Sequence, residues 1–173
     1  MRTSTIVAAL AAAALLVSAG TASGEGNGVV ASASGGWHMS GTAAGSTFEI
    51  QPFTFNVRIY ADGSVAGQFN YTQVRDGGEP LVVKGSLDCA VIEGNRAWVG
   101  GVIEESSRPS LLGLDMWFQV QDNGEPGADG TPDMSSTIGA GGPGTGEQYC
   151  VDHPPVLFPF FLDAGNLQVR PAG

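Results

Sequence analysis

The sequence predicts an all-β fold, a small antiparallel β-barrel or a two-layer β-sandwich of about seven to ten short strands. After the N-terminal segment, apolar runs of strand length are separated by turn-forming residues. No long segment shows the 3.6-residue apolar periodicity of an amphipathic helix. The chain also contains 27 glycines, which supply the turns and bends that short strands require.

Residues 1–23 have the composition of an export signal. Arg2 supplies a positive charge, Ile6–Val17 is an uninterrupted apolar run of 12 residues, and small residues follow. A run of this length is too short to span a bilayer comfortably. We therefore expect a signal peptide at 1–23, a single all-β domain at 24–173, and a secreted, extracellular protein.

The first strand of the expected domain lies near Val29–Ala33 and Trp37–Ser40, and the clearest strand follows at Phe53–Tyr60. In Phe53–Tyr60, apolar side chains alternate with polar ones, as expected when one face of a strand lies on the core. A turn at residues 61–63 then leads into a second strand, Ser64–Gln73.

The apolar pattern of these two strands selects the turn between them. A two-residue loop would place Ile59 opposite Ala66 and mix the two faces. A three-residue loop with Gly63 in the left-handed conformation puts the apolar residues on one side. This loop predicts four cross-strand pairs: Ile59 with Val65, Val57 with Gly67, Phe55 with Phe69, and Phe53 with Tyr71.

A second hairpin is expected to join Leu81–Glu93 to Arg96–Glu104. The connecting dipeptide, Gly94-Asn95, suits a turn with positive φ at its first residue. Both faces of these strands are apolar, so we expect them at the centre of a sheet or covered on both sides. Gly100-Gly101 predicts a bend or a bulge in the second strand.

The remaining segments are shorter. Leu114–Gln121 is predicted to be a strand that runs directly into an acidic loop at Asp122–Asp133. The C-terminal part is expected to contain, in chain order, a short strand around Met134–Ile138, a flexible surface loop at Gly139–Glu147, a proline-broken edge at His153–Phe161, and a last strand at Asn166–Arg170.

The acidic balance of the chain argues against two classes of partner. The sequence has 17 acidic and 7 basic residues, and a formal net charge of −10. Nucleic acids and anionic membrane surfaces both attract clustered lysine and arginine. We therefore expect no nucleic-acid binding and no membrane insertion, and an unknown extracellular ligand or protein as the partner.

Cys89 and Cys150 are the two cysteines of the chain. In an oxidising compartment, such a pair is most simply one disulfide. The alternative, a redox-active or nucleophilic thiol, lacks a CxxC motif.

The densest group of oxygen ligands lies in the acidic loop. Its members are Asp122, Asn123, Glu125, Asp129 and Asp133. Calcium binds about six to eight oxygens, and a glycine-rich loop can fold around it. The spacing does not match the EF-hand template, so two alternatives stay open: a calcium site, or a solvated turn shaped by Asx side chains. No other cofactor is predicted.

The residue pattern does not point to catalysis. There is no GxSxG motif, and the two histidines, His38 and His153, each lie in a stretch that offers one zinc ligand. Glu104 and Glu105 are adjacent in a strand, so their side chains point to opposite faces. We therefore predict no catalytic residues and no enzymatic activity.

Several segments between Phe53 and Asp133 carry a resemblance to a known group. They are FNVR at Phe55–Arg58, GSVAGQFNY at Gly63–Tyr71, VIEGNRAWVGG at Val91–Gly101, and FQVQDNGEPG at Phe118–Gly127, with NLQVR near the end. The chain resembles secreted bacterial β domains related to post-COAP domains. This resemblance implies a compact β fold and an exported protein, and it supplies no catalytic residue.

Two functions follow as expectations. The first is a secreted, non-enzymatic binding or structural module. The alternative is a lipocalin-like barrel that carries a small hydrophobic ligand, since Gly35-Gly36-Trp37 is similar to the GxW opening of lipocalins. That alternative predicts a barrel interior with free space, lined by Phe55, Val57, Phe69 and Trp98.

Overall fold

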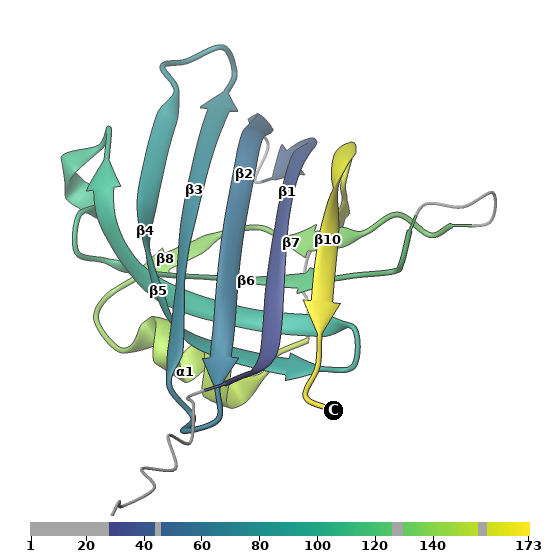
Figure 1. Ribbon diagram of the computed structural model, residues 1–173. Helices are drawn as coiled ribbons and strands as arrows, with labels where there is room; N and C mark the ends of the chain where they lie inside the picture. Colours follow the sequence, from purple (N-terminus) through teal and green to yellow (C-terminus); the bar gives the residue numbers. More distant parts are fainter. Residues whose placement is uncertain (1–27, 44–45, 126–129, 156–158) are drawn as a thin grey trace, which may run out of the picture.

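The computed structural model describes residues 28–43, 46–125, 130–155 and 159–173 (Figure 1). The expected signal peptide at 1–23 lies outside these residues. The described strands are β1 (Val29–Ala43), β2 (Ser46–Tyr60), β3 (Val65–Arg75), β4 (Leu81–Glu93), β5 (Arg96–Ser106), β6 (Asp115–Gln121), β7 (Met134–Ser136), β8 (Gly139–Gly141), β9 (Pro159–Phe161) and β10 (Ala164–Arg170). A 3₁₀ turn, η1 (Pro109–Leu111), and one helix, α1 (Thr145–Asp152), complete the described elements.

The strands of the described chain form one antiparallel sheet. Its order is β10-β1-β2-β3-β4-β5-β6-β7-β9, and β8 pairs with β6 beside β7. The sheet curls so that β5 and β6 cross behind β10, β1, β2 and β3 (Figure 1). The predicted all-β class is confirmed, and the curled sheet encloses its core as a partly closed ring.

Glycines at the inner side of the sheet permit this curvature. A Cβ atom at Gly85 would overlap the carbonyl oxygen of Val102, and a Cβ at Gly101 would overlap that of Ser86. The backbones of β4 and β5 therefore approach each other more closely than side chains would allow. The close approach lies where the sheet turns from its front layer (β10, β1, β2 and β3) to its rear layer (β5 and β6) (Figure 1).

The first predicted hairpin is confirmed in type and register. β2 and β3 pair Ile59 with Val65, Val57 with Gly67, Phe55 with Phe69, and Phe53 with Tyr71. Gly63 has a φ of 82°, the left-handed conformation that the three-residue loop requires.

Both β1 and β2 are longer than the apolar pattern indicates. The β1–β2 ladder continues to Ala43 and Ser46, and Phe48 and Ile50 are buried in the added part. A register shift between Ile50 and Phe53 interrupts the alternation at Gln51-Pro52. This irregularity hides the first third of β2 from a search for strict period-two patterns.

An aromatic cluster fills the space between the two layers. The ring of Trp37 stacks on Phe53 with centroids 4.2 Å apart, and Phe118 meets Phe53 and Phe55 edge-on at 5.0 and 5.2 Å. All four side chains are at most 4% exposed. Stacked and edge-to-face rings stabilise the core beyond their simple burial, by about 0.5–1.5 kcal/mol a pair.

The second hairpin is also confirmed. Gly94 has a φ of 58°, and β4 pairs with β5 from Glu93 and Arg96 onward. The register does shift at Gly100-Gly101, but the extra residue is Asp88 of β4, so the bulge lies in the first strand of the hairpin and not in the second, where it was predicted. The outer side of β5 is covered by α1, as the two apolar faces indicated.

The disulfide prediction is confirmed as well. Cys89 and Cys150 are bonded, with Cα atoms 6.3 Å apart and 61 positions of sequence between them. The bond fastens α1 to the outer side of the rear layer.

The prediction of a flexible loop at Gly139–Glu147 is wrong. Gly139 to Gly141 form β8, and α1 begins at Thr145. A Cβ at Gly139 would overlap the indole of Trp117. This glycine is present because an aromatic ring lies on it, a requirement that composition alone does not distinguish from flexibility.

The other C-terminal predictions are confirmed in outline, and residues 156–158 of the predicted edge lie outside the described residues. β9 is the last strand in the order of the sheet, as its proline required, and β10 pairs with β1. The ring of Phe160 meets that of Phe48 edge-on at 5.3 Å, so β9 closes one end of the core. No helix among the described residues is both long and apolar enough to cross a bilayer.

Candidate functional site

Two members of the predicted calcium group, Asp122 and Asp133, form the seam between the rear layer and β10. Asp133 Oδ2 accepts the backbone N–H of Leu167 at 2.8 Å, and Asp122 Oδ2 accepts that of Val169 at 2.9 Å. These two N–H groups lie on the side of β10 that faces away from β1. Carboxylates thus occupy an edge where the next strand of a closed ring would otherwise pair.

The other carboxylate oxygens shape the loop itself. Asp122 Oδ1 accepts the N–H of Gly124 at 2.8 Å, which is an Asx turn, and Asp133 Oδ1 accepts the N–H of Asn123 at 2.8 Å. Glu125 accepts a long hydrogen bond of 3.5 Å from Asn166, and Asp129 lies outside the described residues. The geometry therefore matches the Asx-turn alternative, and the calcium alternative stays open.

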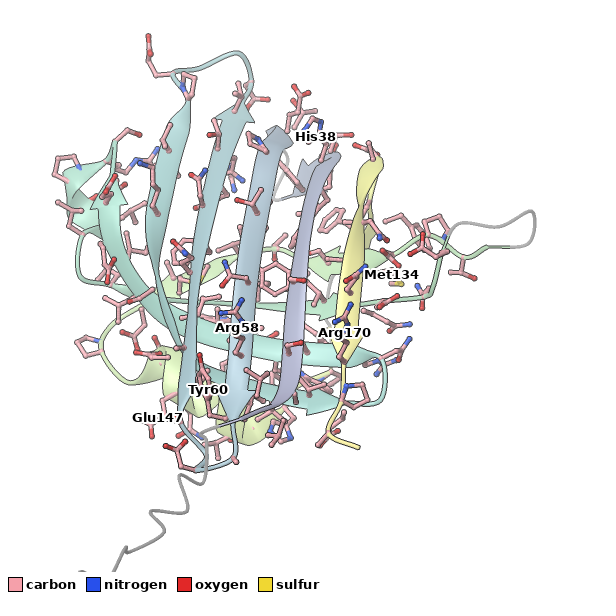
Figure 2. All side chains as sticks on the ribbon, in the orientation of Figure 1. His38, Arg58, Tyr60, Met134, Glu147 and Arg170 are labelled. Atoms are coloured by element: carbon pink, nitrogen blue, oxygen red, sulfur yellow. A yellow bond between two sulfur atoms is a disulfide. The ribbon has the colours of Figure 1, made fainter. Side chains whose placement is uncertain are left out.

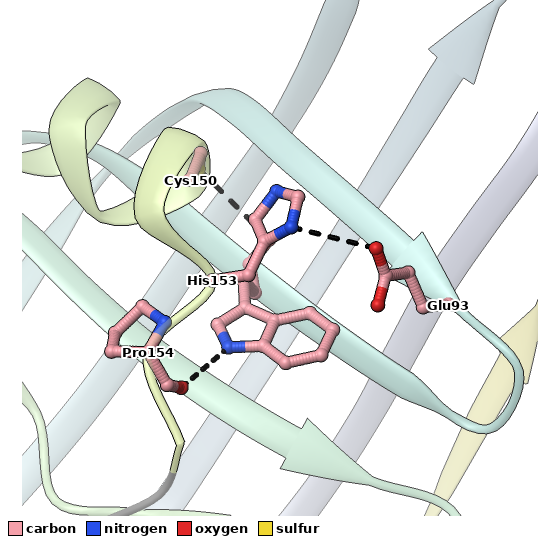
Figure 3. Close-up of polar contacts among 5 residues, drawn as sticks. Glu93, Cys150, His153 and Pro154 are labelled. Carbon is pink, nitrogen blue, oxygen red and sulfur yellow. Dashed lines mark hydrogen bonds and ion pairs between the residues drawn. The ribbon is translucent and has the colours of Figure 1, made fainter.

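The outer side of the rear layer carries a second, smaller core. The Trp98 indole, 5% exposed, donates to the carbonyl of Pro154 at 2.9 Å and lies 5.4 Å from the His153 ring (Figure 3). His153 in turn pairs with Glu93 at 3.4 Å. The chain after α1 is thereby held against β5, on the face opposite the aromatic cluster.

The position of Trp98 corrects one part of the carrier alternative. Phe55, Val57 and Phe69 do line the interior, but Trp98 points to the other side of β5. The interior aromatic rings also contact one another where a carrier needs free space. His38, the other histidine, is exposed at the end of the front layer (Figure 2).

A pocket of about 260 Å³ opens on this outer side, between β6, β7 and the segment after α1. Its lining residues are Arg96, Gln119, Val120, Gln121, Met134, Ser135, Ser136 and Pro155. Exposed Arg96 and Pro155 form its rim, and buried Gln119, Ser135 and Ser136 form its floor.

Gln119 is the unusual member of the floor. Met116, Phe118 and Val120 face the core, so the alternation of β6 directs Gln119 to the outer side, opposite Trp98 of β5. Its side chain is 1% exposed, and neither its Nε2 nor its Oε1 has a hydrogen-bond partner in the described structure. A buried carboxamide without partners costs about 1–3 kcal/mol of stability.

An irregularity in the sheet places Gln119 there. β7 and β8 both pair with β6, but their registers differ by one residue, so Thr137-Ile138 forms a break in the ladder. At the break, the backbone N–H of Gln119 donates to the hydroxyl of Ser136 at 2.9 Å. Such breaks in β-sheets often lie beside binding sites, because they redirect a side chain.

The two serine hydroxyls of the floor already have acceptors. Ser135 donates to the carbonyl of Ser136 at 3.1 Å, and Ser136 donates to that of Thr137 at 2.9 Å. Tyr149 of α1 is also hydrogen-bonded to Ser136. Burial raises the pKa of the Tyr149 phenol, and this effect is larger than the lowering of the pKa by the hydrogen bond to Ser136. The carboxamide of Gln119 is therefore the group on the floor with unused donors.

A chain of hydrogen bonds connects the rim of the pocket to the seam. Arg96 Nε donates to Gln121 Oε1 at 2.9 Å, and Gln121 Nε2 donates to Asn123 Oδ1 at 2.7 Å. Asn123 reaches Asp133 through its backbone N–H. Gln121 thus fixes the direction of the Arg96 guanidinium, and the acidic loop fixes Gln121.

A larger and more open hollow, of about 490 Å³, lies on the outer face of β2, β3, β4 and β5. Its polar side chains include Thr54, Asn56, Gln68, Asn70, Lys84 and Glu105. Lys84 and Glu105 form an exposed ion pair of 2.9 Å. These side chains are open to water, which can form their hydrogen bonds, so the hollow does not indicate a bound ligand.

Sequence reasoning missed Gln119. The only signal was a glutamine within the apolar stretch Met116–Val120, at a position that faces away from the core. Its burial depends on α1 and on the break at Thr137-Ile138, neither of which was predicted. The resemblance to post-COAP-related domains stays a prediction. No family model, curated protein or solved structure matches the chain.

Proposed function

We propose that this protein is a secreted, non-enzymatic binding module that holds a small polar ligand in the pocket around Gln119. The proposal depends on one observation: Gln119 lines a pocket, and its buried carboxamide has no hydrogen-bond partner among the described residues. Secretion is the expectation derived from residues 1–23.

The energetics favour a ligand over a purely structural role. A methionine or leucine of similar size would fill the same space without an unpaired donor and acceptor. A structural role alone gives no reason to keep the unfavourable residue, whereas a ligand that supplies both partners does. Stability lost at a binding site in this way is common in proteins.

The surroundings of Gln119 suit a specific site. Ser136 and the β6 backbone fix its main chain, and the Cys89–Cys150 bond holds the adjoining helix. Rigid walls reduce the entropy lost on binding, so a small ligand can be recognised by few contacts.

A thermal-shift screen tests the proposal. A panel of small polar compounds is added to the wild-type protein, to Gln119→Met and to Gln68→Met, an exposed glutamine on β3 that serves as the matched control. We expect at least one compound to raise the melting temperature of the wild type and of Gln68→Met but not of Gln119→Met. Equal shifts in all three proteins, or none with any compound, would contradict the proposal.

A further inference from the structure

The geometry points to a class of ligand for this pocket: a small molecule or chain end in which an amide lies next to a carboxylate, as in an N-acylated amino acid or at a peptide C-terminus. This inference rests on the proposed function. It assigns the amide to Gln119 and the carboxylate to Arg96.

The assignment of the amide follows from the free groups on the pocket floor. The Gln119 carboxamide has a donor and an acceptor side by side, and both are unused. The hydroxyl hydrogens of Ser135 and Ser136 point to backbone carbonyls. A ligand that satisfies Gln119 fully must therefore present an acceptor and a donor together, as an amide does.

The assignment of the carboxylate follows from the rim. The Arg96 guanidinium has five N–H groups, and its Nε is held by Gln121 at 2.9 Å. Among the described residues, the two ion pairs are Lys84 with Glu105 and His153 with Glu93, so Arg96 has no carboxylate partner. Its cross-strand neighbour Glu93 is paired with His153 instead.

The orientation of the Arg96 guanidinium also suits a carboxylate. A guanidinium that is fixed at Nε presents its remaining N–H groups in one plane, the arrangement that binds a carboxylate with two parallel hydrogen bonds. The ligand must also be small, because the pocket of about 260 Å³ is below the usual range for drug-sized compounds.

The test is an NMR titration of the ¹⁵N-labelled protein that follows the side-chain NH₂ signals of Gln119. The probes are N-acetylglycine, with amide and carboxylate; N-acetylglycinamide, without the charge; acetate, without the amide; and glycerol, with hydroxyls alone. N-acetyl-Ala-Ala-Gly distinguishes two sources of this chemistry. A site for a peptide C-terminus would bind this tripeptide more tightly than N-acetylglycine, whereas a site for a free acyl-amino acid would not.

We expect N-acetylglycine to shift the Gln119 signals and N-acetylglycinamide to bind about tenfold more weakly, the value of one charge-assisted contact. Arg96→Gln, an exposed change that should leave the fold intact, is expected to make the two probes equal. The matched control Arg58→Gln, on the front face (Figure 2), is expected to preserve the difference. Gln119→Met should abolish binding of both.

Two results would overturn the inference in distinguishable ways. Binding of acetate or glycerol that matches N-acetylglycine and still requires Gln119 would refute the ligand class and leave the proposed function standing. If no probe shifts the Gln119 signals, and these show contacts with bound water alone, both the ligand class and the proposed function are wrong.

Discussion

Asp133 holds the backbone N–H of Leu167 at 2.8 Å, and this hydrogen bond joins the rear layer of the sheet to its last strand. Leu167 is 2% exposed, so no solvent competes for the bond. Together with the Asp122–Val169 contact of 2.9 Å, it satisfies strand-edge donors with side chains instead of a neighbouring strand. The ring is therefore closed on this side by carboxylates.

Replacing Asp133 with alanine should lower the free energy of unfolding by about 1–3 kcal/mol, because a buried N–H is left without an acceptor. Denaturant titration measures the loss. Asp163→Ala is the control, since this exposed carboxylate accepts a hydrogen bond from the Ser40 hydroxyl at the surface and not from a buried backbone N–H. An equal loss in both variants would show that the seam does not stabilise the fold.

Calcium is expected to change the melting temperature little, because Asp122 and Asp133 already accept four backbone N–H groups. Differential scanning fluorimetry with calcium and with a chelator measures the effect. A large rise with calcium that disappears in Asp122→Ala would establish the loop as a calcium site and refute this expectation.

Replacing both Cys89 and Cys150 with alanine should destabilise the protein by up to about 4 kcal/mol, because the bond closes a long loop. Since α1 packs against β5, loss of the bond should accelerate amide exchange more in α1 than in β2 and β3. Hydrogen exchange read by mass spectrometry resolves these segments. Uniform acceleration throughout the chain would argue against a helix fastened locally by the disulfide.

Alkaline pH should destabilise the fold. Burial raises the pKa values of Tyr71 and Tyr149 above 10.0, so the folded state retains protons that the unfolded chain releases. The free energy of unfolding should therefore decrease as the pH rises past 10. Urea titrations between pH 8 and 11 measure the slope, which Tyr149→Phe should reduce; an unchanged slope in this variant would be inconsistent with the buried phenol.

The parts of the fold that the sequence predicts are those with strict alternation. Phe53–Tyr71 could be placed to the residue because a one-step slip would expose the row that includes Phe55 and Phe69. The glycines at 139–147 could not be interpreted, because packing under Trp117 and flexibility require the same residue. Gln119 could not be identified as a buried residue for a related reason. Its burial is created by α1 and by a break in the ladder, and both are tertiary features.

The acidic loop shows the same limit in another form. Its density of carboxylates predicted either an ion or a solvated turn, and the structure places Asp122 and Asp133 against the N–H groups of β10, more than 30 positions away in sequence. Such a long-range acceptor cannot be inferred from local spacing.

The central claim, that Gln119 is kept for a ligand, is tested most directly by the stability of the ligand-free Gln119→Met variant. Denaturant unfolding should give a free energy about 1–3 kcal/mol higher than that of the wild type, because an unpaired buried amide is removed while the volume is preserved. A clear loss of stability would show that Gln119 already has its hydrogen-bond partners within the folded protein, and this would contradict the proposal that the pocket binds a ligand.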